Sequence, residues 1–210
     1  MQVTEAMIRT AIRQPLPGQD AHDRLMPFKR PTPQAAKAQG KSPKIGAVMM
    51  LVYPDAGELH TVLMRRPTYP GVHSGQISFP GGKQEPEDLD HQFTALRETQ
   101  EEVGVAPSQV EVLGKWTSLY IPPSNFIMHP YLGWTPEKPS WAPDPREVDA
   151  VLETPLSHLL DPNTLEKRVV PTGVGGTRIE VGGFALESDF IWGATAMVLM
   201  EFRTVLESLR

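Results

Sequence analysis

Three glutamates, Glu98, Glu101 and Glu102, lie within five residues of one another, and Arg97 directly precedes them. An α-helix advances about 100° per residue, so the three carboxylates would point to one side of a helix. Arg97 lies one turn before Glu101, but a surface ion pair contributes only about 0–1 kcal/mol. The spacing therefore predicts a patch of negative charge that the helix itself does not neutralise.

A divalent metal ion is a suitable partner for such a patch. Mg²⁺ prefers oxygen ligands, keeps several waters and bridges to the phosphates of substrates. The preceding segment Phe79-Pro80-Gly81-Gly82 ends in two glycines, which permit close backbone approach and leave carbonyl oxygens available. A solvated acidic helix face is the alternative, but it leaves the glycines and the arginine as coincidences. The residues therefore indicate a metal site that handles phosphate groups.

The helix that positions the glutamates is expected from about Asp88 to Val103, because Gly104 is placed to end it. On a helical wheel centred on Leu96, five residues fall on the side opposite the glutamates. The residues expected to face the core are Phe93, Leu96, Thr99, Gln100 and Val103.

Strands are expected before and after this helix, at residues 45–53, 60–66, 76–79, 110–119 and 126–134. Residues 136–146 read as a loop. A short helix at 155–160, a hairpin around 173–176 and a final helix at 192–209 follow. Because strands precede, separate and follow the helices, the pattern predicts a mixed α+β domain rather than a regular βαβ array.

The N-terminal region differs from the rest of the chain. Residues 1–13 read as a short helix with Ile8, Ala11 and Ile12 on one side. The stretch that follows is rich in proline and polar residues, and it predicts an irregular arm laid over a domain. We therefore divide the chain into an arm at 1–43 and a domain at 44–210.

Composition excludes several classes of function. The 210 residues carry a net charge of −5, which does not favour nucleic acid as a partner. There is no cysteine, so disulfides, thiolate zinc sites and cysteine nucleophiles are ruled out. The longest apolar run is too short to span a bilayer, and the N-terminus lacks the apolar core of a signal peptide. A cytoplasmic protein with no membrane partner is the expectation.

The chemistry-bearing segment resembles the signature of the Nudix hydrolases, G-x5-E-x7-R-E-U-x-E-E-x-G-U. Gly82 is similar to its first glycine, and residues 97–105, RETQEEVGV, are similar to its second half. Three departures occur. Thr99 stands at the aliphatic position U, Asp88 stands at the first acidic position, and one extra residue precedes Arg97.

A subgroup is also indicated. Residues 62–64 and 73–82 are similar to the element that precedes the signature in coenzyme A pyrophosphatases, and residues 191–196, IWGATA, look like that group's C-terminal helix start. The resemblance implies an α/β/α sandwich with a mixed β-sheet. It implies hydrolysis of the diphosphate bond of coenzyme A or its thioesters, giving phosphopantetheine and adenosine 3′,5′-bisphosphate. Other Nudix substrates (NADH, ADP-ribose, a nucleoside triphosphate) and a catalytically silent nucleotide-binding module are the alternatives.

The resemblance also implies roles for individual residues, with Mg²⁺ or Mn²⁺ as the cofactor. Glu98 and Glu102 are the implied metal ligands, Glu101 lies close to the metals, and the Gly81 or Gly82 carbonyl is a further ligand. The implied role of Arg97 is to orient a glutamate, so the catalytic set is Glu98, Arg97 and Glu101. The general base is left open between Glu98 and the later residues Glu147 and Glu153.

Substrate contacts are expected beside the glycine segment. Arg65 or, preferably, Arg66 at a strand end could reach a phosphate, and His73 together with Gly81 and Gly82 could contact it too. Each of these side chains has a purely structural alternative. The aromatic residues Tyr120, Phe126 and Trp134 could stack on adenine or belong to the core. The expected partner is a small molecule, and the resemblance makes a homodimer one form that the chain could take.

Overall fold

The computed structural model describes all residues except 1, 27, 69–74, 172–176, 188 and 210. An eight-stranded mixed sheet forms its centre, with the order β3-β2-β1-β7-β5, while β4 pairs with β1, β6 with β7 and β8 with β2. Strands β1 and β7 run parallel, and the other described pairs in this sheet are antiparallel. The strands are β1 (Lys44–Asp55), β2 (Glu58–Arg65), β3 (Ile77–Ser78), β4 (Gly81–Lys83), β5 (Glu111–Lys115), β6 (Leu119–Ile121), β7 (Phe126–Trp134) and β8 (Ala150–Pro155).

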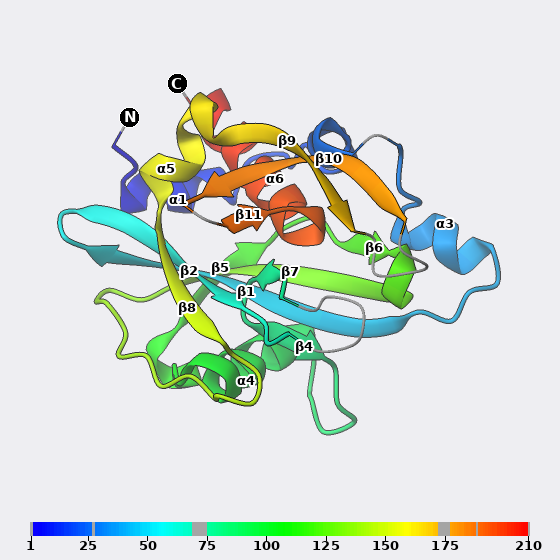
Figure 1. The fold of residues 1–210 in the computed structure, drawn as a ribbon. Coiled ribbons are helices and arrows are strands. Elements are labelled where there is room, and N and C mark those ends of the chain that lie inside the picture. The colour runs from blue at the N-terminus through cyan, green and yellow to red at the C-terminus, as the bar shows by residue number, and fades with distance from the viewer. Residues whose placement is uncertain (1, 27, 69–74, 172–176, 188, 210) are drawn as a thin grey trace.

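Helices cover both faces of the large sheet. In Figure 1, α4 (His91–Val103) lies below the sheet, and α6 (Gly193–Ser208) lies above it. A second sheet above the first contains β9 (Leu165–Pro171), β10 (Arg178–Leu186) and β11 (Asp189–Ile191), in the order β11-β10-β9. The short helix α5 (Leu156–Leu160) follows β8. The predicted α+β sandwich with a mixed sheet is confirmed.

Strand β1 is buried on both faces, which explains its nearly continuous apolar sequence. Side chains alternate across a strand, so Met49 and Leu51 pack in a cluster with Ala95 of α4. Met50 and Val52 point the other way, into the larger core that includes α6. Because full burial of each such side chain contributes roughly 1.5–3 kcal/mol, β1 is a firm support for the strands that pair with it.

Helix α4 begins later than predicted and ends where predicted. The Asp90 side chain accepts a hydrogen bond from the Phe93 amide at 2.8 Å and caps the first turn. Gly104, with φ 82°, ends the helix in the left-handed conformation.

The predicted core face of α4 was partly wrong: Thr99 and Val103 are buried and Leu96 packs against the core, but the other two predicted residues are not buried. Phe93 is 41% exposed and Gln100 is exposed, whereas Glu102, predicted on the outer face, is buried. The residues that turn inward are Thr94, Ala95, Thr99, Glu102 and Val103. Small and hydroxyl-bearing side chains allow the helix to lie close to β1 and β4, and the Thr99 hydroxyl donates to the Ala95 carbonyl at 2.6 Å. The helical wheel was centred on Leu96, whereas the buried side of the helix is centred nearer to Ala95 and Glu102.

Several sequence-predicted elements need correction in their extent. The stretch predicted as one strand at 110–119 is divided into β5 and β6, and β8 was not predicted. The two glycines and Lys83, which lie outside every predicted strand, form strand β4 against β1. Strands β9 and β10 pair as a hairpin, and the turn predicted at 173–176 lies outside the described residues.

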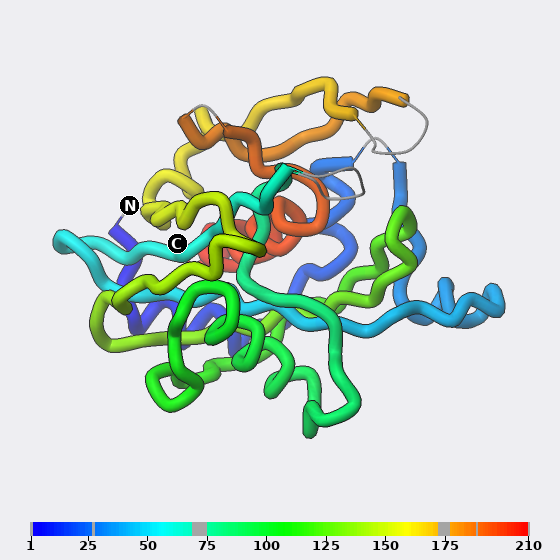
Figure 2. The backbone as a smooth tube through the Cα atoms, turned by 60° about the horizontal axis from the view of Figure 1, so that its bottom comes forward, coloured from blue at the N-terminus to red at the C-terminus, as the bar shows by residue number. Residues whose placement is uncertain are grey.

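The N-terminal arm is more helical than predicted. It contains α1 (Glu5–Ala11), α2 (Gln19–His22), a 3-10 turn (Asp23–Leu25) and α3 (Pro33–Ala38). Ile8 and Leu25 are buried in the same core as α6, and Figure 2 shows these N-terminal turns beside the C-terminal helix. In the described part of the chain, no helix has the length and apolar character needed to cross a membrane.

Candidate active site around Gly81 and Gly82

The backbone of Gly81 fits tightly against strand β1. Its φ is +150°, and a Cβ atom there would lie 2.4 Å from the Ala47 carbonyl oxygen and 2.5 Å from the Val48 Cα. Backbone atoms cannot move aside as a flexible side chain can, so glycine is required at this position. The short strand β4 is thereby held directly on the rigid strand β1.

Glu98 packs against the next glycine. A Cβ atom on Gly82 would lie 2.5 Å from all three atoms of the Glu98 carboxyl group. The missing side chain therefore makes the space that the carboxylate occupies, and the side chain of Glu98 is only 13% exposed. The predicted pairing of a glycine segment with a glutamate helix is a direct contact in the structure.

Glu102 is held at the same point from the neighbouring turn of α4. The Gly81 amide donates to Glu102 Oε2 at 2.6 Å, and Arg66 Nη2 lies 3.4 Å from Glu102 Oε1. Arg66 also donates to the Gly81 carbonyl at 3.0 Å. Gly81, Glu102 and Arg66 thus form one connected cluster, which places the predicted substrate-binding arginine beside the predicted metal ligand.

Arg97 connects Glu98 of this cluster to Asp88 and Lys83. Its Nε and Nη2 donate to the two carboxylate oxygens of Asp88 at 2.9 and 3.0 Å, and Nη2 also donates to the Lys83 carbonyl at 3.1 Å. Its Nη1 lies 3.0 Å from Glu98 Oε1 and 2.9 Å from Glu101 Oε2. The guanidinium therefore links the loop after β4 to two glutamates of α4.

Asp88 holds the Arg97 guanidinium in place, a role that was not recognised from the sequence. Its carboxylate also accepts from the Glu85 amide at 2.9 Å and the Thr94 hydroxyl at 2.8 Å. The hydrogen bonds from Arg97, above all, hold the pKa of Asp88 well below its usual range. The signal was present, because Asp88 stands at the first acidic position of the signature.

The pKa values of Glu98 and Glu102, the two glutamates at the glycines, are shifted in the opposite direction to that of Asp88. Desolvation raises the pKa of Glu98, and it raises the pKa of Glu102 to about 8 against the opposing effects of Arg66 and the Gly81 amide. Glu98 raises the pKa of Glu102 further, and Glu147 raises the pKa of both by its negative charge. The carboxylates of Glu98, Glu102 and Glu147 thus repel one another in a partly desolvated site.

The donor set of this cluster suits a hard cation. In the described residues, no three His, Cys, Asp or Glu side chains already surround a common ion position. Glu98 and Glu102 nevertheless present carboxylate oxygens at adjacent glycines, and burial raises the pKa of each despite the neighbouring Arg97 and Arg66. A hard cation bound by these oxygen ligands would offset the cost of burying the two carboxylates. The residues present therefore fit Mg²⁺ or Mn²⁺.

The other predicted metal ligands lie at the margin of the cluster. The side chain of Glu101 is 57% exposed and pairs with Arg97. The Gly82 carbonyl lies against Gly46 of β1, and the Gly81 carbonyl accepts from Arg66. Metal ligation by Glu101 and Gly82 stays a prediction.

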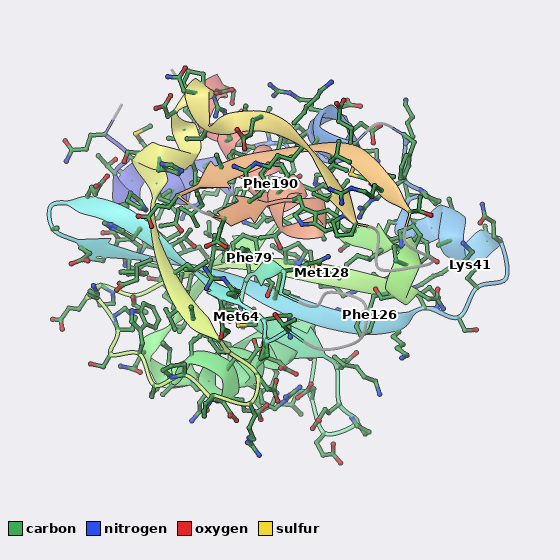
Figure 3. All side chains as sticks on the ribbon, viewed as in Figure 1. Lys41, Met64, Phe79, Phe126, Met128 and Phe190 are labelled. Carbon is green, nitrogen blue, oxygen red and sulfur yellow. The ribbon has the colours of Figure 1, made fainter. Side chains whose placement is uncertain are left out.

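A cavity of about 420 Å³ opens beside the two glycines. It lies between the large sheet, the start of α6 and the arm, and Figure 3 shows Phe79 and Met128 in this region, below the small sheet that carries Phe190. Its lining is mostly apolar and includes Phe126, Met128 and Trp192. Three cationic residues, Arg30, Arg66 and Lys83, also line it.

The remaining sequence-predicted residues divide into those near this cavity and those elsewhere. Phe126 lines the cavity, whereas Tyr120 and Trp134 are buried in the core. Arg65 pairs with Asp149 and Asp189 and not with the glutamate cluster. His73 lies outside the described residues.

The two later glutamates considered as general bases differ in position. Glu147 faces Glu98 and Glu102 closely enough to raise the pKa of both. Glu153 instead accepts a hydrogen bond from the Tyr53 hydroxyl at 2.9 Å and pairs with Lys138 at 2.8 Å.

Sequence reasoning did not identify Arg30 and Lys83 as residues of this cavity. Lys83 follows the glycines directly, which is a local signal that could have been used. Arg30 belongs to the arm, and its position depends on how the arm packs on the domain. No local sequence pattern reports such a long-range contact.

Comparison with known proteins agrees with this reading of the fold and the signature. The family model of the NUDIX domain matches residues 43–171. The glycine strand, the glutamate helix and the mixed sheet all fall within this span. The chain belongs to the Nudix family.

Relatives come from plants, bacteria and animals. The chain is 34% identical over 170 residues to Nudix hydrolase 22, chloroplastic, of Arabidopsis thaliana, covering 78% of this chain and 55% of that protein. It is 37% identical over 141 residues to the mitochondrial coenzyme A diphosphatase NUDT8 of Homo sapiens, covering 67% of this chain and 58% of that protein. The chain thus spans little more than half the length of these two relatives.

Two further comparisons concern bacterial proteins. The Nudix hydrolase NudL of Yersinia enterocolitica is 35% identical over 138 residues, covering 66% of this chain and 69% of that protein. Among solved structures, the Nudix hydrolase RenU of M. smegmatis aligns with a TM-score of 0.54 at 13% identity, covering 80% of this chain and 88% of that one. At such low identity the structural likeness concerns the fold alone.

Proposed function

We propose that this protein hydrolyses the diphosphate bond of coenzyme A or its thioesters. The observation that carries the proposal is the cavity of about 420 Å³ that adjoins the glycine–glutamate cluster, because it offers apolar walls and cationic groups together. Coenzyme A has a diphosphate flanked by a long, weakly polar pantetheine arm and by an adenosine, so both kinds of surface have a use. The relative named a coenzyme A diphosphatase adds support.

The proposed reaction is a displacement at phosphorus. A water oxygen bonds to one phosphorus of the diphosphate, the bridging P–O bond breaks, and the bridging oxygen leaves with the other phosphate. The products are phosphopantetheine and adenosine 3′,5′-bisphosphate. Catalysis of such a transfer depends on positioning and on stabilising negative charge.

Individual residues have separate tasks in this proposal. Glu98 and Glu102 would hold the divalent metal, which when bound neutralises phosphate charge and lowers the pKa of water. Arg66 reaches both Glu102 and the cavity, so its guanidinium is placed to contact a phosphate oxygen. Arg97 is a positioning residue, since its described contacts are to Asp88, Lys83, Glu98 and Glu101.

The proton of the attacking water needs an acceptor. Glu98 is the candidate on α4, and Glu147 is the candidate on the loop before β8, because both lie in the cluster of mutually repelling carboxylates. Glu153 is engaged by Tyr53 and Lys138 away from that cluster, which favours the other two.

The test is direct. Purified protein is incubated with coenzyme A and either Mg²⁺ or Mn²⁺, the products are separated by chromatography, and Glu102→Gln is run beside it. Adenosine 3′,5′-bisphosphate formed only by the unsubstituted protein is the expected result. Intact coenzyme A together with rapid cleavage of NADH or ADP-ribose would reassign the substrate, and no cleavage of any of these would overturn the proposal.

A further inference from the structure

The charged lining of the cavity is entirely cationic. Arg30, Arg66 and Lys83 contribute to it, and in the described part of the chain no aspartate or glutamate does. The residues outside the described set contain neither amino acid in their sequence. Such a cavity favours a ligand with more than one anionic group.

Two of the three cations, Arg66 and Lys83, are either paired with a carboxylate or exposed to solvent. Arg66 donates to the Gly81 carbonyl and pairs with Glu102, so it belongs to the glycine–glutamate cluster. Lys83 is exposed to solvent at the end of β4. Neither is a buried cation without an anionic neighbour.

Arg30 is different. Its Nη1 atom is buried and has no hydrogen-bond partner among the described residues, and its Nη2 contacts only a weak acceptor, the Met26 sulfur at 3.7 Å. Burial lowers the pKa of Arg30 to about 10, and no carboxylate offsets that effect. The side chain is therefore charged at neutral pH and partly desolvated, a combination that is costly without a bound anion.

Arg30 reaches the cavity from a different part of the chain than the glycine–glutamate cluster does. Gly81 and Gly82 belong to β4, and Arg66 directly follows β2. Arg30 instead comes from the arm, four residues after Met26, which also lines the cavity. A substrate that spans the cavity would thus meet two cationic groups on two different walls.

We propose that Arg30 binds a phosphomonoester group of the substrate that is separate from the diphosphate being cleaved. A planar guanidinium matches the oxygens of a phosphate and can donate two parallel hydrogen bonds. In coenzyme A this group is the 3′-phosphate, so the inference rests on the proposed function and names its specificity-determining residue.

The experiment measures binding rather than turnover. The affinities of adenosine 3′,5′-bisphosphate and of AMP, which lacks the 3′-phosphate, are compared by calorimetry for the unsubstituted protein, Arg30→Met and Lys29→Met. Lys29→Met is the matched control, because it removes the same charge at the adjacent position. The Lys29 side chain is 89% exposed.

The unsubstituted protein and Lys29→Met are expected to prefer the bisphosphate by about 10- to 100-fold. In Arg30→Met this preference is expected to shrink to about threefold or less, with AMP affinity little changed. The proposal is overturned if the unsubstituted protein shows no preference, if Arg30→Met keeps it, or if both ligands weaken equally.

Stability provides a second readout. Replacement of a partly buried, unpaired cation by methionine removes a desolvation cost, so the melting temperature of Arg30→Met should be unchanged or higher. If Arg30→Met does not fold, Arg30→Lys is used instead. It keeps the positive charge but loses the two parallel N–H donors of the guanidinium, so the preference for the bisphosphate over AMP should fall at least threefold. An unchanged preference overturns the proposal. Failure of the unsubstituted protein to cleave coenzyme A would refute the proposed function without altering these binding outcomes.

Discussion

Glu102 and Glu201 are both buried glutamates on helices, at 1% and 0% exposure, yet their surroundings have opposite effects. The Glu201 carboxylate accepts from the Gly18 amide at 3.0 Å and from the amide and hydroxyl of Thr117 at 3.1 and 2.5 Å. His22 Nε2 lies 3.4 Å away. These partners hold the pKa of Glu201 below its usual value despite the desolvation that opposes them.

Glu102 has fewer donors for the same degree of burial. One amide at 2.6 Å and one arginine at 3.4 Å leave desolvation dominant, and the pKa of Glu102 rises to about 8. The contrast teaches that burial alone does not reveal a carboxylate's role. Glu201 is satisfied by the fold and joins the arm to α6, whereas Glu102 is left short of positive charge at the metal site that we propose.

The largest expected effect comes from Glu102→Gln. Removal of one of the carboxylates proposed to bind the metal should lower kcat/KM for coenzyme A by about 10³-fold or more, since metal stabilisation of phosphate charge contributes several kcal/mol. Melting temperatures measured with and without Mg²⁺ or Mn²⁺ test the same idea independently. Saturating metal should stabilise the unsubstituted protein by about 2–3 kcal/mol at 100-fold excess over its Kd and Glu102→Gln much less.

Glu87→Gln is the charge-matched control for that comparison, because Glu87 is exposed on the loop before α4. It should retain both the activity and the stabilisation by metal. Equal stabilisation of Glu102→Gln and the unsubstituted protein by metal would remove Glu102 from the metal site.

Glu201→Gln should affect stability and not chemistry. The glutamine NH₂ would replace one carboxylate oxygen and would face the N–H or O–H donors of Gly18 or Thr117. A loss of about 2–4 kcal/mol in the free energy of unfolding is therefore expected. Urea unfolding measures this as a lower midpoint. Glu207→Gln on the same helix, whose carboxylate pairs with Arg203 and is 32% exposed, should cost about 1 kcal/mol or less.

A normal unfolding midpoint for Glu201→Gln would mean that the donors around it are satisfied in another way, and the comparison with Glu102 would fail. Loss of activity per folded molecule would likewise contradict a purely structural role.

The sequence could predict that Glu98 and Glu102 meet the glycine segment, but not the role of Glu201. Glu98, Glu102 and Arg97 lie within one local signature, and the glycines that contact them are close in sequence. Glu201 reads as an ordinary polar residue of the final helix. Its partners Gly18 and Thr117 are far away in the chain, and no periodicity reports their proximity.

The same limit explains the errors within the site. The inward face of α4 could not be read completely from the helical wheel, because Thr94 and Glu102 are buried with their polar atoms bonded to Asp88 and to the Gly81 amide. The position of Arg30 could not be read either, since it follows from the packing of Ile8 and Leu25 in the core. Contacts between residues close in sequence were predictable, whereas contacts between distant segments required the fold.

Arg97→Lys sharpens the comparison within the active site. Lysine cannot reproduce the fork that joins Asp88, Lys83 and the glutamates, so Glu98 would lose its orientation. We expect kcat/KM to fall by about 10- to 100-fold, with more Mg²⁺ needed for half-maximal activity. An unchanged metal requirement would reduce Arg97 to a structural ion pair.

The smallest expected effect is the acid sensitivity carried by Glu201. Its pKa in the folded protein lies below the ordinary value of 4.5, so its ionised form stabilises the fold above pH 4.5, and this contribution is lost as the pH falls through the folded-state pKa. Other carboxylates, such as Asp88, titrate in the same direction, and His22 lies against Glu201. The informative quantity is therefore the difference in unfolding free energy between the unsubstituted protein and Glu201→Gln from pH 7 to pH 3. That difference should shrink steadily below about pH 4.5, and a difference that stays constant would show that the carboxylate charge contributes nothing to the junction between the arm and α6.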